Sequence, residues 1–218
     1  MEDLKEEIAN EEFGMVLGVD GSGRVPALII EKVIKHVSPV EVRFIAGSRP
    51  EEGVSTREDE LEEYFSGEVF KALKAEGKRV LIVEDTLVTG ESLVDICRAL
   101  QNKEVEYEIV SLSYLGSKKI SSGEFSTRLG AKVHFSGKWT PSIYRKKKMS
   151  GVYKEKGDVF AKPLAKYEDK SNSSIPDARS YGGGEDDDEI FMDDPEVLRH
   201  TRKLVKEVSD DIIKKLDL

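Results

Sequence analysis

Short apolar runs alternate with longer amphipathic segments between residues 15 and 136, and this alternation restricts the possible fold most. The short runs are rich in valine, isoleucine and leucine, which is typical of buried strands. The longer segments repeat apolar residues every three or four positions, which is typical of helices. Strands that alternate with helices form a mostly parallel sheet flanked by helices on both faces. We therefore predict an α/β fold with strands at 15–19, 40–46, 79–83, 107–114 and 132–136, and helices at 2–12, 25–37, 61–75 and 91–102.

One predicted strand leads directly into two adjacent carboxylates. Residues 80–83 are apolar, Glu84 and Asp85 follow at the strand's carboxyl end, and residues 86–92 lead into a helix. Ligands of open parallel sheets bind beyond the carboxyl ends of strands. Exposed N–H groups at a helix start bind anions, and carboxylates accept hydrogen bonds from a sugar diol. A ribose that carries a 5′-phosphate needs both features, and a buried strand with a polar turn and a capped helix is the alternative.

Residues 80–92 resemble the 5-phosphoribosyl-1-pyrophosphate (PRPP) signature of type I phosphoribosyltransferases. That signature is an apolar run, two acidic residues and a loop that ends in Thr-Gly-x-Ser/Thr. The resemblance implies that Glu84 and Asp85 hold the ribose 2′- and 3′-hydroxyls, directly or through Mg²⁺-bound water. It also implies that the following loop binds the 5′-phosphate through its N–H groups and hydroxyls. The substrate-binding residues expected there are Thr86, Leu87, Val88, Thr89, Gly90, Glu91 and Ser92.

A glycine-rich turn follows the first predicted strand and consists of Asp20, Gly21, Ser22, Gly23 and Arg24. In the family a loop at this place, before the first crossover helix, holds pyrophosphate oxygens with its backbone N–H groups. Gly21 and Gly23 would permit the unusual dihedral angles that such a loop needs. Arg24 would add positive charge. An ordinary turn between a strand and a helix is the alternative.

The polar segment 47–59 lies where the family has a flexible loop that closes over the active site. Closure excludes water from the reaction, and a basic side chain on the loop would neutralise the leaving pyrophosphate. We expect Arg49 to be catalytic in this way, and Arg57 lies on the same segment. Arg43, at the end of the second strand's apolar run, is a further substrate-binding candidate. Several acidic residues between 51 and 60 make a solvated surface loop the alternative.

The reaction that the resemblance implies is displacement of pyrophosphate from ribose C1 by a nitrogen of a base, with Mg²⁺ as cofactor. Members of the hypoxanthine–guanine type place an aspartate where Val88 stands, and Val88 cannot assist at the ring nitrogen in that way. A pyrimidine such as orotate is therefore the favoured acceptor. One alternative is a PRPP-binding regulator or sensor without turnover. Another is a structural protein that retains an empty site.

The chain divides by composition into three parts. Residues 1–167 form the predicted phosphoribosyltransferase-like domain, in which residues 135–167 are the candidate for a base-selecting hood, with Trp139 or Tyr144 available for stacking. Residues 168–194 read as an acidic flexible linker. Residues 195–218 read as a helix with one apolar face, which would dock on the chain's own body or on a partner, and a homodimer is one such arrangement.

Charge and hydropathy argue against several other classes of protein. Residues 168–218 carry 15 acidic and 8 basic side chains, so that segment accounts for −7 of the net charge of −9, and residues 1–167 carry only −2. A nearly neutral body argues against a nucleic-acid-binding surface. There is no apolar run of transmembrane length, and we expect no signal peptide. The single cysteine, Cys97, fits a reducing cytoplasm and a place in the core, and the three histidines lack metal-ligand spacing.

Overall fold

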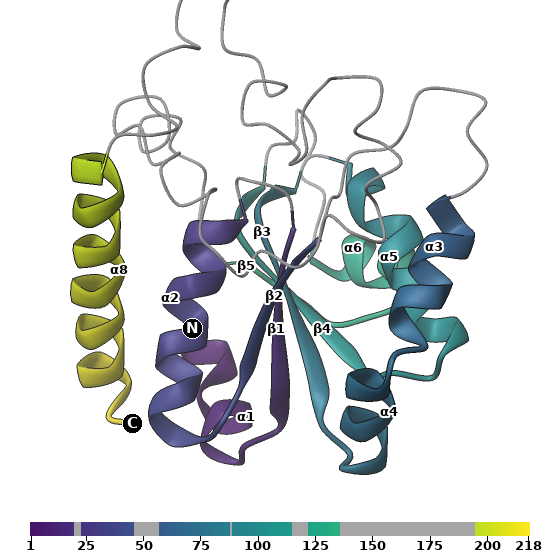
Figure 1. Cartoon of the computed structure of the whole chain (residues 1–218), viewed down its shortest axis with the longest axis horizontal. Helices are drawn as coiled ribbons and strands as arrows, with labels where there is room; N and C mark the ends of the chain where they lie inside the picture. Colours follow the sequence, from purple (N-terminus) through teal and green to yellow (C-terminus); the bar gives the residue numbers. More distant parts are fainter. Residues whose placement is uncertain (20–22, 46–56, 88, 115–121, 136–194) are drawn as a thin grey trace, which may run out of the picture.

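Five parallel strands form one sheet at the centre of the protein (Figure 1). The computed structural model describes residues 1–19, 23–45, 57–87, 89–114, 122–135 and 195–218. The strand order is β2-β1-β3-β4-β5, and every neighbouring pair is parallel. This arrangement confirms the predicted α/β fold. The strands are β1 (Phe13–Val19), β2 (Glu41–Ile45), β3 (Arg79–Leu87), β4 (Tyr107–Tyr114) and β5 (Val133–Phe135).

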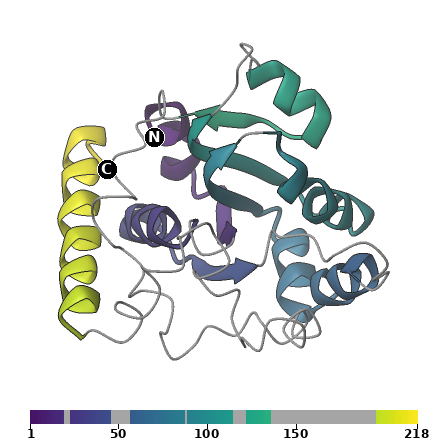
Figure 2. The ribbon, with the colours of Figure 1, turned by 90° about the horizontal axis from the view of Figure 1, so that it is seen from above.

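Helices cover both faces of the sheet (Figure 2). One face packs against the 3-10 helix η1, α1 and α2, and α8 lies along the outer side of α2. The other face packs against α3, α4, α5 and α6. The bounds are η1 (Glu2–Leu4), α1 (Lys5–Ala9), α2 (Arg24–Val37), α3 (Arg57–Phe65), α4 (Glu68–Ala75), α5 (Glu91–Asn102), α6 (Ser122–Leu129) and α8 (Pro195–Leu216).

The alternation of side chains along β3 produces two separate hydrophobic layers. Val80 and Ile82 pack on the side of α5, whereas Leu81 and Val83 pack on the side of α2. Successive residues of a strand point to opposite faces, and a central parallel strand is buried on both. This is why residues 80–83 are continuously apolar. The central strands thus hold the two helical layers in fixed positions relative to the carboxyl ends of β1 and β3.

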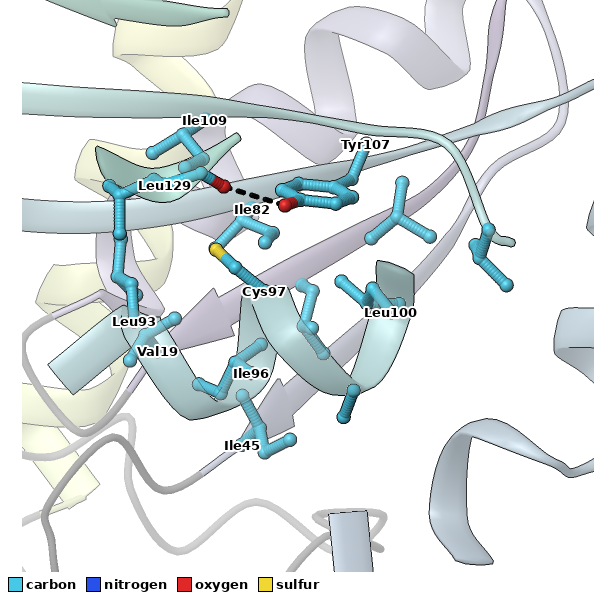
Figure 3. Close-up of a cluster of buried hydrophobic side chains, with 14 of the residues drawn as sticks. Val19, Ile45, Ile82, Leu93, Ile96, Cys97, Leu100, Tyr107, Ile109 and Leu129 are labelled. Carbon is cyan, nitrogen blue, oxygen red and sulfur yellow. Dashed lines mark hydrogen bonds between the residues drawn. The ribbon is translucent and has the colours of Figure 1, made fainter. Parts of the chain in front are cut away.

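The layer beneath α5 contains the single cysteine (Figure 3). Cys97 lies among apolar side chains that include Ile82 and Leu100. Nearby, the Tyr107 hydroxyl donates a hydrogen bond to the carbonyl oxygen of Leu129 at 2.7 Å. This bond satisfies a polar group inside the layer and joins the start of β4 to the end of α6. Cys97 is therefore a core residue, as the sequence predicts.

We expect the Cys97 thiol to be nearly unreactive in the native protein. Burial raises its pKa from 9.0 to about 12, because the thiolate is penalised in an apolar environment. The fold therefore favours the protonated thiol, and the stability that this contributes should decline as the pH rises from 9.0 towards about 12. Iodoacetamide labelling at pH 8, followed by mass spectrometry, should be at least roughly 100-fold slower in buffer than in urea. Equal rates would contradict the buried assignment.

Two predicted helices differ from the structure. The helix expected at 2–12 is a short 3-10 turn followed by α1, because Glu11 takes a positive φ of 57° and turns the chain into β1. The helix expected at 61–75 is split into α3 and α4, because Gly67 is extended (ψ 155°). The break sets the Phe65 and Phe70 rings edge to face, with their ring centres 4.9 Å apart. In addition, α6 was not expected from the sequence.

A network of charged side chains lies at the amino end of the sheet, opposite the predicted ligand site. Arg79 at the start of β3 pairs with Glu12 and with Glu108 of β4. The buried Nε2 of His134 lies 2.7 Å from a carboxylate oxygen of Glu108. Buried charged groups are normally paired in this way. His134, to which the sequence assigned no role, therefore joins β5 to β4.

The helix α8 packs along α2 through a few side chains. Val205 and Val25 form a small buried cluster against which Leu28 and Ile29 pack, while Leu216 joins the layer between α2 and the sheet. The buried Ser209 hydroxyl lies 2.6 Å from the carbonyl oxygen of Val205 and 3.3 Å from that of Ile29. In the part of the chain that the structure describes, no helix is long and apolar enough to cross a membrane.

We expect Leu216→Ala to lower the free energy of unfolding by about 2–3 kcal/mol, because it leaves a cavity where α8 meets the core. The matched control is Val208→Ala on the same helix, where the side chain is 40% exposed. That variant should change stability by less than about 0.5 kcal/mol. Urea denaturation followed by circular dichroism measures both. Equal effects of the two substitutions would show that α8 does not pack here in solution.

Candidate active site

The two motifs that the sequence singles out follow neighbouring strands of the sheet. One follows β1 and the other begins within β3, and Gly18 of β1 pairs with Val83 of β3. A Cβ placed on Gly23 would lie 2.7 Å from the carbonyl oxygen of Val83. The start of α2 is therefore packed directly against the strand that carries the acidic pair. Gly23 and the acidic pair both lie at the carboxyl edge of the sheet, where open α/β folds bind ligands.

The acidic pair lies inside β3 rather than after it. The sequence predicts that the strand ends at Val83, but β3 continues to Leu87 because β4 stays alongside it. Glu84 is opposite Ser111 in the register and is only 5% exposed. Asp85 is half-buried, and its backbone N–H lies 3.2 Å from Oε1 of Glu84. Because side chains alternate along a strand, the two carboxylates leave the backbone towards opposite faces of the sheet.

The segment that joins β3 to α5 is shorter than the sequence predicts. Thr86 and Leu87 belong to β3, and Glu91 and Ser92 belong to α5, so only residues 88–90 connect the two elements. Val88 lies outside the described residues. Gly90 is the residue before α5 and has φ 74°, a left-handed conformation that favours glycine.

The oxygen Oγ1 of Thr89 lies close to the helix start. It accepts a long hydrogen bond of 3.4 Å from the N–H of Glu91. A threonine hydroxyl that accepts in this way can still donate its own proton. The first turn of α5 begins after residues 88–90, with its positive dipole end at the carboxyl edge of the sheet.

Gly23 serves a different purpose from the one predicted. Its φ of −72° and ψ of −13° are ordinary helical values, so the position does not need glycine for its dihedral angles. Instead, an added Cβ would lie 2.3 Å from the carbonyl oxygen of Val19, as well as close to Val83. Glycine is required because the backbones of β1, β3 and α2 approach one another here. Asp20, Gly21 and Ser22 lie outside the described residues.

A model of the phosphoribosyl transferase domain family matches residues 1–123, more than half of the 218 residues. The chain belongs to the phosphoribosyltransferase family. It is therefore an enzyme that uses PRPP to transfer a phosphoribosyl group to a base. Both motifs, β3 and α5 lie within the matched range, whereas most of α6, all of β5 and α8 lie beyond it.

Among solved structures, the purine phosphoribosyltransferase from Pyrococcus horikoshii Ot3 shares 17% sequence identity with this chain. The alignment covers 65% of this chain and 88% of that one, with a TM-score of 0.33. No curated protein gives a match.

Two arginines predicted to bind substrate in this phosphoribosyltransferase make other contacts. Arg24, the first residue of α2, is buried, and its guanidinium lies 4.7 Å from the centre of the Phe44 ring. Arg43 lies in the middle of β2, not at its end, and a guanidinium nitrogen lies 2.6 Å from Glu41 Oε1. Burial alone would lower the pKa of Arg43, but Tyr64 and Glu41 together raise it. These contacts direct Arg43 towards Glu41 and α3.

The remaining candidates fall in part outside the described residues. Arg49, Trp139 and Tyr144 are among those outside. Arg57, which the sequence places in the closing loop, is the first residue of α3. The loop expected at 47–59 therefore ends earlier than predicted.

The metal that the sequence predicts would have few protein ligands in this enzyme. Among the residues that the structure describes, no group of three or more His, Cys, Asp or Glu side chains is placed to hold a metal ion. Glu84 and Asp85 are two carboxylates on opposite faces of one strand. Such a set fits a Mg²⁺ ion that keeps most of its waters and binds chiefly to substrate oxygens. It does not fit a metal enclosed by the protein.

Sequence reasoning missed the contribution of α6 to this region. A Cβ on Gly90 would lie 3.5 Å from the ring of Phe125, which is buried under the loop. On the same helix, Arg128 lies with its guanidinium 3.4 Å from Oε1 of Glu91. The apolar spacing of Phe125 and Leu129, followed by Gly130, is the helix signal that the sequence contains. In the structure Gly130 has φ 66° just after the helix. The phosphoribosyltransferase thus supports its loop with a helix that lies largely beyond the family match.

Proposed function

We propose that this phosphoribosyltransferase is Mg²⁺-dependent and transfers the 5-phosphoribosyl group of PRPP to a ring nitrogen of a pyrimidine such as orotate. The observation that carries the proposal is the position of Glu84 and Asp85, which are adjacent in β3, the strand that residues 88–90 join to the start of α5. Carboxylates there are suited to a ribose diol, and the helix start is suited to its 5′-phosphate. The binding places for the ribose and for its 5′-phosphate are thereby separated by a single short turn of the chain.

The proposed reaction breaks the bond between ribose C1 and the pyrophosphate oxygen, and the electron pair leaves with pyrophosphate. The lone pair of the base nitrogen forms the new C1–N bond, and the proton on that nitrogen is released. Positive charge develops on the ribose ring in the transition state. Glu84 and Asp85 hold the ribose hydroxyls and stabilise that charge, because fixed carboxylates interact strongly in a partly buried site.

The loop after β3 binds the 5′-phosphate through the N–H groups at the start of α5, while residues 20–24 bind the pyrophosphate. When bound, Mg²⁺ neutralises charge on the leaving pyrophosphate. Arg49 is proposed to add positive charge there as well. Residues 135–167 are proposed as the hood that selects the base.

The preference for a pyrimidine rests on the residue at position 88. The proposed loop carries valine there, and valine has no group to assist at the ring nitrogen of a 6-oxopurine in the way an aspartate does. Valine at this position disfavours one class of acceptor and identifies no contact to another. Orotate is therefore the acceptor that we rank first.

Pyrophosphate release from Mg²⁺–PRPP tests the proposal directly. The acceptors to compare are orotate, uracil, adenine, guanine, hypoxanthine and xanthine, each with and without EDTA. We expect release that depends on orotate and is abolished by EDTA. Release with a purine instead would overturn the pyrimidine assignment and leave the transfer reaction in place. PRPP binding by calorimetry without release for any base would favour the alternative of a PRPP sensor.

A further inference from the structure

The loop proposed to bind phosphate carries a negative charge of its own. Glu91 is the first residue of α5 and is half exposed. A phosphate and a carboxylate are both anions, and both are attracted to the N–H groups and the positive dipole end of a helix. A carboxylate at the first helical position therefore competes with the 5′-phosphate for the same place. A second element is needed to hold that carboxylate aside.

Arg128 is placed to do this. Its guanidinium nitrogen lies 3.4 Å from Oε1 of Glu91, although the two residues are 37 positions apart in the sequence. Guanidinium groups bind carboxylates well, since several N–H donors are held in a fixed plane. Arg128 lies in α6, beside the loop, so the contact directs the Glu91 side chain towards α6.

The position of α6 is fixed by the core and not by this exposed contact. Phe125 and Leu129 are buried, and both lie next to Gly90, within 3.6 Å of where its Cβ would be. The carbonyl oxygen of Leu129 also accepts the hydrogen bond from the Tyr107 hydroxyl. Arg128 lies between these anchored residues, so core packing holds the backbone that carries it beside the start of α5.

We propose that Arg128 is a positioning residue for the 5′-phosphate of PRPP. It acts through Glu91, by holding that carboxylate against α6 and leaving the start of α5 to the phosphate. This inference rests on the proposed function, and in particular on the loop 86–92 as the phosphate site. It adds a residue beyond the range of the family match, which ends at residue 123.

The test separates the phosphate end of PRPP from its pyrophosphate end. Calorimetry measures the binding of ribose 5-phosphate and of Mg²⁺–pyrophosphate to the full chain. In Arg128→Gln, we expect ribose 5-phosphate to bind about fivefold more weakly. One charge at a helix start changes binding by about this much. The binding of pyrophosphate should be unchanged. The loss should shrink as salt is raised, because the effect is electrostatic.

A second substitution decides whether Arg128 acts through Glu91. On the Glu91→Gln background there is no competing carboxylate, so Arg128→Gln should change ribose 5-phosphate binding less than twofold. Glu91→Gln alone should bind ribose 5-phosphate more tightly than the wild type. Arg98→Gln is the matched control, since it removes an arginine of similar exposure that pairs with Asp95 on α5. It should leave both ligands unaffected.

Three outcomes would overturn the inference. The first is unchanged ribose 5-phosphate binding in Arg128→Gln. The second is a loss of the same size on the Glu91→Gln background, which would indicate a direct or purely structural role. The third is an equal loss for pyrophosphate. If the wild type binds neither ribose 5-phosphate nor PRPP, the proposed function fails and this inference with it. Binding by the wild type with no effect of Arg128 removes this inference alone.

Discussion

Replacing Asp85 by asparagine should lower kcat/KM for PRPP by about 100- to 1,000-fold, and Glu84→Gln should have an effect of similar size. Each substitution keeps the shape of the side chain and removes its negative charge. The charge is what stabilises a ribose ring that becomes positive in the transition state. Pyrophosphate release under subsaturating PRPP measures the effect for both variants.

The two substitutions should differ in their effect on the free energy of unfolding. Glu84 is almost completely buried, and Oε1 lies close to the N–H of Asp85, a contact that the amide oxygen of glutamine preserves. Asp85 is half-buried, and its replacement should change the free energy of unfolding by less than about 1 kcal/mol. The matched control is Asp95→Asn in α5, where the carboxylate pairs with Arg98 at 3.9 Å. It should retain full turnover.

An Asp85→Asn variant that turns over PRPP at the wild-type rate would remove the ribose-binding role from β3. A loss of activity that follows a loss of folded protein would not support that role either. Circular dichroism and PRPP calorimetry on the same sample keep these two causes apart. If PRPP affinity falls together with turnover while the fold is intact, the carboxylates bind the substrate as proposed.

The second large effect is expected at Gly23. Gly23→Ala would place a Cβ 2.3 Å from the carbonyl oxygen of Val19 and 2.7 Å from that of Val83. Both are backbone atoms of central strands, and neither can move without shifting the sheet. We expect a loss of about 3 kcal/mol of stability. Turnover should fall beyond detection, because the start of α2 and the end of β1 would be displaced from the acidic pair.

Gly67→Ala is the control for this experiment. Gly67 lies on the surface between α3 and α4, and its added Cβ would have one close neighbour, the carbonyl oxygen of Tyr64 at 3.2 Å. We expect a cost below about 1 kcal/mol and normal turnover. Thermal denaturation and pyrophosphate release should be measured for both variants. A Gly23→Ala protein as stable and active as Gly67→Ala would show that the close packing of β1, β3 and α2 is absent in solution.

The parts of the fold that the sequence predicts well are those with strong local patterns. The strand at 107–114 and the helix at 91–102 are confirmed at both ends, because each combines a clear apolar period with polar or glycine residues at its boundaries. The end of β3 was placed too early. A run of apolar residues marks burial, and β3 continues past it because β4 supplies hydrogen-bonding partners, which depends on tertiary structure.

The sequence predicts which residues make up the site but not the contacts from other elements that hold them in place. The acidic pair and the loop after it are contiguous, so one segment reveals them. The reason for glycine at position 23 is an approach between three backbones, and no local pattern records it. Likewise, Arg43 is contacted by Tyr64 from α3, and Glu91 by Arg128 from α6. Such contacts join residues that are far apart in the chain, so they emerge only when the helices are placed on the sheet.

The layer between α2 and the sheet has a consequence for synthesis of the chain. Its members include Leu4 and Ile8 near the start, and Ile212 and Leu216 more than 200 residues later. The five strands are complete once residue 135 has been made. A nascent chain can therefore assemble its sheet on the ribosome while part of this layer is still bare, since domains form as their segments emerge. We expect that exposed surface to attract chaperones until residues 212–218 leave the exit tunnel and close it.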